Sequence, residues 1–219
     1  MRTLGIIRAI TLIFLISVAA SAQRFGATGL GPADFRGQFN PVVGSGAAYR
    51  LEVAGSPLKP EEEVTIVGRE TVDGKEGYWI EFAMLSESPR YIKTLLLVDG
   101  NELLSKRLIT QSADMPPVEL PLPEAPKSTP FKSPFVTPAD NRQIADKLGT
   151  ETITTPGGTF DCDHYRAKDG SWEEWLSPQV TPWGLVKTTS RIGTMTLTRV
   201  VTNATDHITG TPRLENDDR

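Results

Sequence analysis

Apolar residues alternate with polar ones in short runs along most of this chain, a pattern typical of β-strands that bury one face. In the segment 77–85 every second residue is large and apolar, and this face comprises Tyr78, Ile80, Phe82 and Met84. Similar β-prone runs occupy 49–53, 64–70, 91–98 and 102–110. We therefore expect successive antiparallel strands through the first half of the chain.

The second half repeats this organisation after a long interruption. The segments 150–155, 159–167, 171–176, 185–191 and 194–202 are predicted strands, several of them rich in threonine. Asp-Gly pairs at 73–74, 99–100 and 169–170 each separate two runs, and this pair favours the tight hairpin turns that need positive φ. The pattern predicts a mainly β protein built from hairpins.

The interruption is rich in proline, with eight prolines between Met115 and Pro138. Proline nitrogens cannot donate to a sheet, so 115–138 is predicted to be a loop or linker. Thr137 and Asp140 suggest a variant of the capping box, and Gly149 suggests a stop, so a short helix is predicted over 138–148. One sheet with a long excursion is favoured over two domains, since neither flank is large enough for a comfortable core of its own.

The two ends of the chain differ from this pattern. Residues 1–22 combine two arginines, an apolar run and the small residues Ala20-Ser21-Ala22, as a secretory signal peptide does. We expect cleavage before Gln23, no transmembrane segment afterwards, and no lipid anchor, because no cysteine stands at the cleavage point. The expected product is a soluble periplasmic or secreted protein. A flexible Gly/Pro-rich arm is expected over 23–47, one domain over 48–205, and a disordered acidic tail over 206–219.

Composition narrows the choice of partner. The 219 residues include 23 basic and 27 acidic side chains, a net charge of −4 that becomes more negative without the leader. This balance disfavours nucleic acid and anionic membrane surfaces as partners. The single cysteine, Cys162, has no second cysteine with which to form an internal disulfide in an oxidising compartment.

The segments 155–166, 175–177 and 180–187 contain the motifs TPGGTFDCDHYR, WLS and VTPWGLVK. Together they resemble the final hairpins of the lipoprotein-carrier (LolA-like) half-barrel superfamily and of related exported domains. The resemblance covers about 150–200. It implies a strongly curved antiparallel sheet with a small helical plug, whose concave face in the carriers holds acyl chains.

Candidate catalytic and metal sites are weak in this sequence. Cys162 and His164 share a face of their predicted strand, but zinc needs three or four ligands, and the other histidine, His207, lies near the C-terminus. We expect Cys162 to be a packing residue. Glu173 and Glu174 are adjacent on a strand and point apart, so they are interpreted as solvated rather than as a catalytic dyad. No phosphate loop, dinucleotide motif or nucleophile elbow is present, so we expect no enzyme activity, no metal and no cofactor.

A ligand site is a better hypothesis than a catalytic one. A curved open sheet needs something apolar on its inner face, and one short helix would not cover it. The candidate ligand-binding residues are Tyr78, Ile80, Phe82, Phe160, Trp175 and Trp183. For the four tryptophans, filling the core is favoured over lining a ligand-binding face. The sequence thus predicts an exported, non-enzymatic protein that binds a lipid-like or other apolar ligand; the alternative is a structural or protein-interaction module of the cell envelope.

Overall fold

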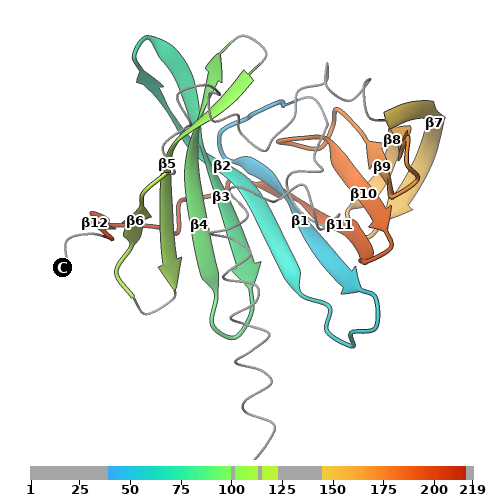
Figure 1. The fold of residues 1–219 in the computed structure, drawn as a ribbon, viewed down its shortest axis with the longest axis horizontal. Coiled ribbons are helices and arrows are strands. Elements are labelled where there is room, and N and C mark those ends of the chain that lie inside the picture. Colours follow the sequence, from blue (N-terminus) through green and yellow to red (C-terminus); the bar gives the residue numbers. More distant parts are fainter. Residues whose placement is uncertain (1–38, 100–101, 113–114, 123–144, 216–219) are drawn as a thin grey trace, which may run out of the picture.

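The computed structural model describes residues 39–99, 102–112, 115–122 and 145–215 of the chain. These segments form twelve strands and, among the described residues, no helix (Figure 1). The strands are β1 (Ser45–Val53), β2 (Glu61–Val72), β3 (Lys75–Leu85), β4 (Arg90–Asp99), β5 (Glu102–Ser112), β6 (Val118–Leu120), β7 (Ala145–Thr155), β8 (Gly158–Ala167), β9 (Trp172–Leu176), β10 (Leu185–Ser190), β11 (Gly193–Thr202) and β12 (Arg213–Leu214).

All twelve strands belong to one open sheet, in the order β12-β6-β5-β4-β3-β2-β1-β11-β10-β9-β8-β7. The strands β1–β6 form a meander, and the strands β7–β11 form a second meander that returns to β1. Every neighbouring pair is antiparallel except β12 and β6, so the sheet is mixed. The expected mainly β architecture is confirmed, and the two edges of the sheet are β7 and β12.

The turn residues explain much of this connectivity. Asp73 (φ 53°) and Gly74 (φ 75°) both adopt positive φ between β2 and β3, as a tight hairpin requires. Gly170 (φ 70°) lies in the turn between β8 and β9. β4 and β5 also pair as a hairpin, with Asp99 opposite Glu102, although Gly100 lies outside the described residues.

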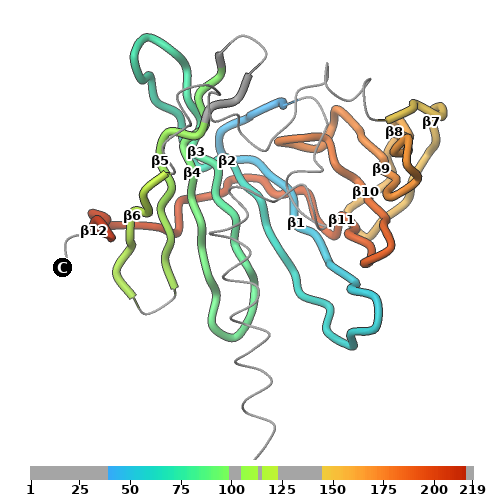
Figure 2. Tube along the Cα trace, in the orientation of Figure 1, coloured from blue at the N-terminus to red at the C-terminus, as the bar shows by residue number. Residues whose placement is uncertain are grey.

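The core lies where the two meanders pack against each other. One hydrophobic cluster combines residues of the first meander, such as Ile80 and Leu96, with residues of the second, such as Leu185 and Met195. Register shifts interrupt several strands, including β1 after Ala48, and such bulges bend and twist a sheet. Figure 2 shows the path of the chain through β1 and through the strands β8–β10.

The predicted helix over 138–148 is wrong in the part that the structure describes. Ala145, Asp146 and Lys147 belong to β7 and pair with β8, and Leu148 lies within the same strand. Gly149 does not end a helix but sits at a register shift inside the strand, with φ 153°. Hydrogen bonding to β8 outweighs the local helix signals here. The remaining helix residues, 138–144, lie outside the described segments.

The proline-rich excursion also differs from its prediction where it is described. Val118, Glu119 and Leu120 form the short strand β6, which pairs with β5 on one side and with β12 on the other. These three residues are free of proline, so their nitrogens can donate to a neighbour. Residues 123–138 lie outside the described segments.

The two terminal predictions need correction as well. The expected arm over 23–47 is described from Phe39 onward, and there Phe39 packs on the core while Ala47 is fully buried in β1. The expected disordered tail is placed up to Glu215, with Ile208 buried and β12 in the sheet. An apolar side chain at Ile208 and backbone pairing at β12 give this polar segment its anchors. The predicted signal peptide lies outside the described residues.

Candidate functional site

The six candidate ligand-binding residues come together in one hydrophobic cluster. Ile80 and Phe82 come from β3, Phe160 from β8, Trp175 from β9 and Trp183 from the loop before β10, and each is at most 9% exposed. Tyr78 is half-buried and packs against the same cluster. The sequence therefore located side chains that converge, although they come from distant segments.

Trp183 lies at the centre of the aromatic part of this cluster. It is 2% exposed and stacks on Phe82 with ring centroids 6.2 Å apart and planes 20° apart. Phe39 lies 5.8 Å from Trp183 and 5.9 Å from Tyr78, and the Asn40 N–H donates to Pro182 O over 2.8 Å. In this structure Trp183 packs against aromatic rings of the chain itself, and residues 39 and 40 lie beside its loop.

Phe160, Cys162 and His164 alternate along β8 and are all buried, as predicted for one face of this strand. The Cys162 thiol is fully buried, and burial, followed by the charges of Asp161 and Asp163, raises its pKa to about 11. A thiol in this state stays protonated at neutral pH and is a poor nucleophile. Within the described segments, no three His, Cys, Asp or Glu side chains are arranged to hold a metal ion.

His164 is held between two carboxylates. Its Nδ1 lies 2.7 Å from Glu151 Oε1 on β7, and its Nε2 lies 2.8 Å from Glu173 Oε2 on β9. Its ring stacks on Trp175 with centroids 4.4 Å apart, and Trp175 Nε1 donates to Glu151 Oε2 over 3.2 Å. Because a carboxylate only accepts, both contacts are satisfied at once when both ring nitrogens carry a proton. We call Glu151, His164 and Glu173 the histidine clamp.

The electrostatics of the clamp follow from these contacts. Hydrogen bonds from His164 and Trp175 lower the pKa of Glu151 below its ordinary value. For Glu173, burial raises the pKa, but the hydrogen bonds from His164 and from Arg166 Nε, the latter 2.8 Å long, outweigh burial, so the pKa is lowered. Both carboxylates are therefore charged at neutral pH and attract the imidazole ring.

Sequence reasoning missed this clamp. Glu151 stands in a threonine-rich strand and carries no motif, and the only signal was its place across the hairpin from Cys162 and His164. The interpretation of Glu173 and Glu174 as solvated is wrong for Glu174, which is 1% exposed, whereas Glu173 is partly exposed and bound to His164. The two side chains do point apart, as alternation requires.

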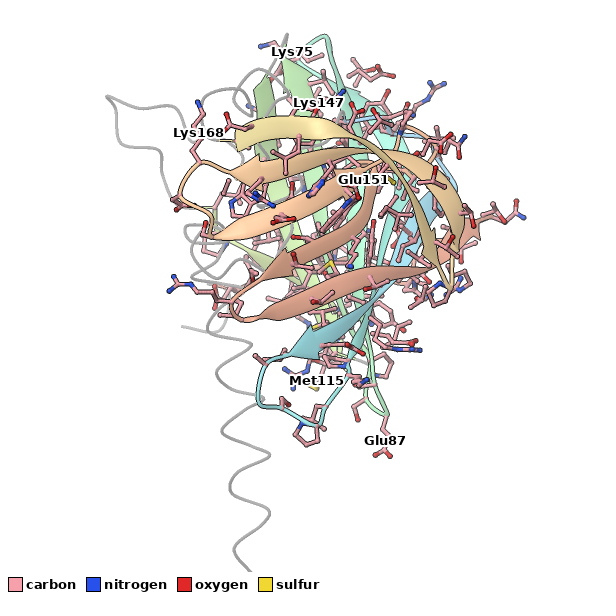
Figure 3. All side chains as sticks on the ribbon, turned by 90° about the vertical axis from the view of Figure 1, so that its right-hand side faces the viewer. Lys75, Glu87, Met115, Lys147, Glu151 and Lys168 are labelled. Carbon is pink, nitrogen blue, oxygen red and sulfur yellow. The ribbon has the colours of Figure 1, made fainter. Side chains whose placement is uncertain are left out.

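A second set of side-chain contacts joins β7 to β8. Lys147 Nζ lies 2.6 Å from Asp163 Oδ2, and the hydroxyl of Thr150 donates to the other oxygen of Asp163 over 3.2 Å. Thr152 donates to Asp161 over 2.7 Å. Figure 3 views the molecule from the side of β7, with Lys147 and Glu151 labelled. Together with the clamp, these contacts fix the edge strand to its one neighbour.

Among the described segments, β7 has a sheet neighbour on one edge only. It is the last strand in the sheet order, and each of the seven residues 146–152 is exposed. An edge strand presents backbone N–H and C=O groups that no sheet neighbour satisfies. The structure thus holds an eleven-residue strand in extended form, and no other described strand pairs with its second edge.

A pocket of about 210 Å³ lies at the opposite edge of the sheet. Lys106 and Arg107 of β5, Glu119 and Leu120 of β6, and Leu214 of β12 contribute to its lining. Arg107 forms two hydrogen bonds with Glu119, of 2.8 and 2.7 Å. None of the six predicted ligand-binding residues lines this pocket.

Searches with the sequence match no family model and no curated protein. Two solved structures are similar to this chain. One is a proposed lipoprotein from Parabacteroides distasonis, with 16% identity and a TM-score of 0.36, covering 74% of this chain and 97% of that one. The other is a proposed exported protein with a YmcC-like fold from Bacteroides fragilis, with 12% identity and a TM-score of 0.35, covering 75% of this chain and 99% of that one. The half-barrel carrier resemblance stays a prediction.

Proposed function

We propose that this chain is an exported, non-enzymatic interaction module of the cell envelope that binds a partner protein by strand addition at β7. Export rests on the leader pattern of residues 1–22. The observation that supports the binding mode is the state of β7, which is exposed over residues 146–152 yet fixed on both faces to β8.

Strand addition needs an extended, unpaired backbone, and its affinity comes from main-chain hydrogen bonds. A mobile strand would lose conformational entropy on pairing, at about 1–2 kcal/mol per ordered residue. The histidine clamp and the Asp163 contacts already hold β7 in place, so little of this cost remains. The edge is therefore preorganised for a partner strand.

The side chains of β7 suit a selective partner. Its threonines favour β-structure, and the segment 145–155 contains no proline. The register shift between Lys147 and Gly149 and the charge of Lys147 are features that limit indiscriminate edge pairing. Such a strand would pair with a partner whose side chains and bend match, rather than with any exposed edge.

Binding of an apolar ligand is the second candidate. It is favoured by the convergence of Phe82, Phe160, Trp175 and Trp183 in one cluster, but a ligand there would have to displace packed aromatic rings. Mass spectrometry of an organic extract of the purified mature protein separates the two candidates. A stoichiometric lipid would favour the carrier function over the interaction module.

The strand-addition proposal is tested with a photo-crosslinking amino acid placed in cells at Leu148 of β7. Leu58 supplies a matched control, because it is also apolar and exposed (59%, against 47% for Leu148) but lies outside the strands. We expect a protein adduct from position 148 and none from position 58. The purified partner should then slow amide exchange along β7. Equal adducts at both positions, no adduct at 148, or unchanged exchange in β7 would overturn the proposal.

A further inference from the structure

The segment 203–215, which we call the C-terminal strap, crosses the sheet instead of leaving it. The strap starts beside β1, where the Ala204 N–H donates to Gly44 O over 2.8 Å. It ends at β12, where Leu214 lies opposite Glu119 of β6 and the Glu215 N–H donates to Glu119 O over 3.2 Å. Figure 1 shows this segment running behind the strands β1–β6.

The strap crosses a row of register partners that runs from β2 to β6. The row consists of Thr65, Glu81, Lys93, Ile109 and Glu119. Glu81 is 1% exposed and Lys93 is 8% exposed, and such burial of charged groups is costly unless they are paired. Their partners lie on the strap.

Glu81 is the main anchor. Its Oε1 lies 2.6 Å from Nδ1 of His207, and its Oε2 accepts the backbone N–H groups of His207 and Ile208 over 3.1 and 3.3 Å. A buried carboxyl group with two backbone N–H donors and one imidazole contact holds the strap at one point by side-chain and main-chain bonds together.

Lys93 is the second anchor. Its Nζ contacts Asp206 Oδ2 at 2.5 Å and donates to Ile208 O over 3.2 Å, and it lies 5.2 Å from the ring centre of Trp79. Between the anchors, the His207 ring stacks on Tyr91 with centroids 4.7 Å apart. Ile208 is 3% exposed.

We propose that the strap is a proton-operated latch. It is docked while the Glu81–His207 pair holds one proton beyond the N–H that a neutral imidazole always carries, and it is loosened when the pair loses this proton. With one proton in the pair, either an imidazolium faces a carboxylate or a neutral ring faces a carboxyl group. Without this proton, the buried Glu81 carboxylate faces a neutral His207 ring and loses its charged partner on the strap. His207 is partly exposed (44%), so the pair can exchange its proton with solvent while docked.

The charges near Glu81 do not reverse the expected loosening of the strap at higher pH. Burial raises the pKa of Glu81, and the hydrogen bonds and charge of His207 only partly offset burial. A carboxyl whose pKa is raised by docking takes up a proton on docking, so docking weakens as pH rises through the raised value. The other titratable groups that contact the strap at these anchors are Lys93, Asp206 and Tyr91. Lys93 and Asp206 pair with each other.

Release of the latch would uncover one face of the first meander. Lys93 and Leu95 share that face by alternation, and Ile109 lies opposite Lys93. Leu95 and Ile109 are buried in the docked structure, at 1% and 3% exposure. An opened strap would thus expose an apolar surface that the docked protein hides.

The latch is tested by amide exchange of His207 and Ile208 in the full mature chain, between about pH 5 and pH 9, a range that spans ordinary histidine titration. Observed rates are divided by the intrinsic rate at each pH, so that only protection is compared. We expect protection to fall as pH rises, by at most about tenfold per pH unit, the limit for one linked proton. Protection that is independent of pH in the wild-type protein would overturn the proposal.

Two variants and a control identify the pair. Glu81→Gln removes the titrating carboxyl with little change in shape, and His207→Gln removes the imidazole at a partly exposed position. In each variant the protection should lose its pH dependence. Asp206→Asn weakens the Lys93 anchor, so it should lower protection at every pH without changing the slope. A slope retained in both His207→Gln and Glu81→Gln, or lost in Asp206→Asn, would contradict the assignment.

Discussion

His164 Nδ1 lies 2.7 Å from Glu151 Oε1 although the two residues are not register partners, since Glu151 lies opposite Cys162 and Gly149 opposite His164. Such a diagonal contact across a strand pair is within reach of long side chains. It ties the edge strand β7 to β8, and the second contact of the ring, with Glu173, extends the tie to β9. One buried imidazole therefore links the edge strand β7 to both β8 and β9.

Replacing this imidazole should loosen the edge. His164→Ala removes two charge-assisted hydrogen bonds and the stack on Trp175, so we expect the free energy of unfolding to fall by about 2–4 kcal/mol in urea denaturation at pH 7. Arg166→Ala is the control. It removes a half-exposed ion pair with Glu173 and should cost about 1 kcal/mol or less.

The stability difference between wild type and His164→Ala should depend on pH. The pKa values of Glu151 and Glu173 are lowered in the folded protein, so their contribution is present above the ordinary glutamate value and is lost as pH falls through the lowered values. The stability difference between wild type and His164→Ala should accordingly shrink below about pH 4.5. A difference that stays constant down to about pH 3 would show that the clamp is not electrostatic.

Cys162 should behave as a packing residue. Cys162→Ala removes a fully buried thiol and should lower the free energy of unfolding by about 1–3 kcal/mol through lost packing. In the folded wild-type protein, alkylation by iodoacetamide at pH 8 should be slow, because burial raises the thiol pKa to about 11. Denatured protein provides the reference rate, and equal rates in the two states would refute this assignment.

A charge at Phe160 should prevent folding. Phe160 is 8% exposed within the main cluster, so Phe160→Asp would bury a carboxylate among apolar neighbours. We expect loss of the cooperative unfolding transition in circular dichroism. Asp161→Ala, at the next position on the exposed face, loses only the contact with Thr152 and should fold normally. A folded Phe160→Asp protein would mean that this position is not core.

Glu62 should make the protein less stable at alkaline pH. Glu62 lies opposite Tyr49 across the β1–β2 pair, and burial raises its pKa to about 7. A raised carboxyl pKa gives stability that is present below the ordinary value and lost as pH rises through about 7. Relative to wild type, the free energy of unfolding of Glu62→Gln should therefore rise by about 2–3 kcal/mol between pH 5 and pH 8. Glu61→Gln, which breaks an exposed pair with Arg50, should show no such gain.

The leader prediction is tested directly by N-terminal sequencing of the exported protein. The small residues Ala20-Ser21-Ala22 predict a mature chain that begins at Gln23 and that osmotic shock releases. A mature protein that still contains residues upstream of Ala20 would refute this cleavage site.

The local pattern of the sequence determined the strands and their turns. Alternation located the runs that became β1–β5, the second half of β7, and β8–β11, and Asp-Gly pairs located the turns between β2 and β3 and between β8 and β9. Alternation also placed Phe160, Cys162 and His164 on one buried face. These features depend on residues a few positions apart, so the sequence alone contains the information.

Only the tertiary structure decided which distant segments meet. The pairing of β1 with β11 joins the two meanders, the diagonal contact of Glu151 with His164 crosses a hairpin, and the strap brings His207 to Glu81 over 126 positions. Local signals were overridden at Ala145–Leu148, where pairing with β8 replaced the expected helix, and at Ile208, where burial fixed a polar tail. Burial and long-range hydrogen bonding depend on neighbours that the chain acquires only when folded, so no local pattern could reveal these contacts.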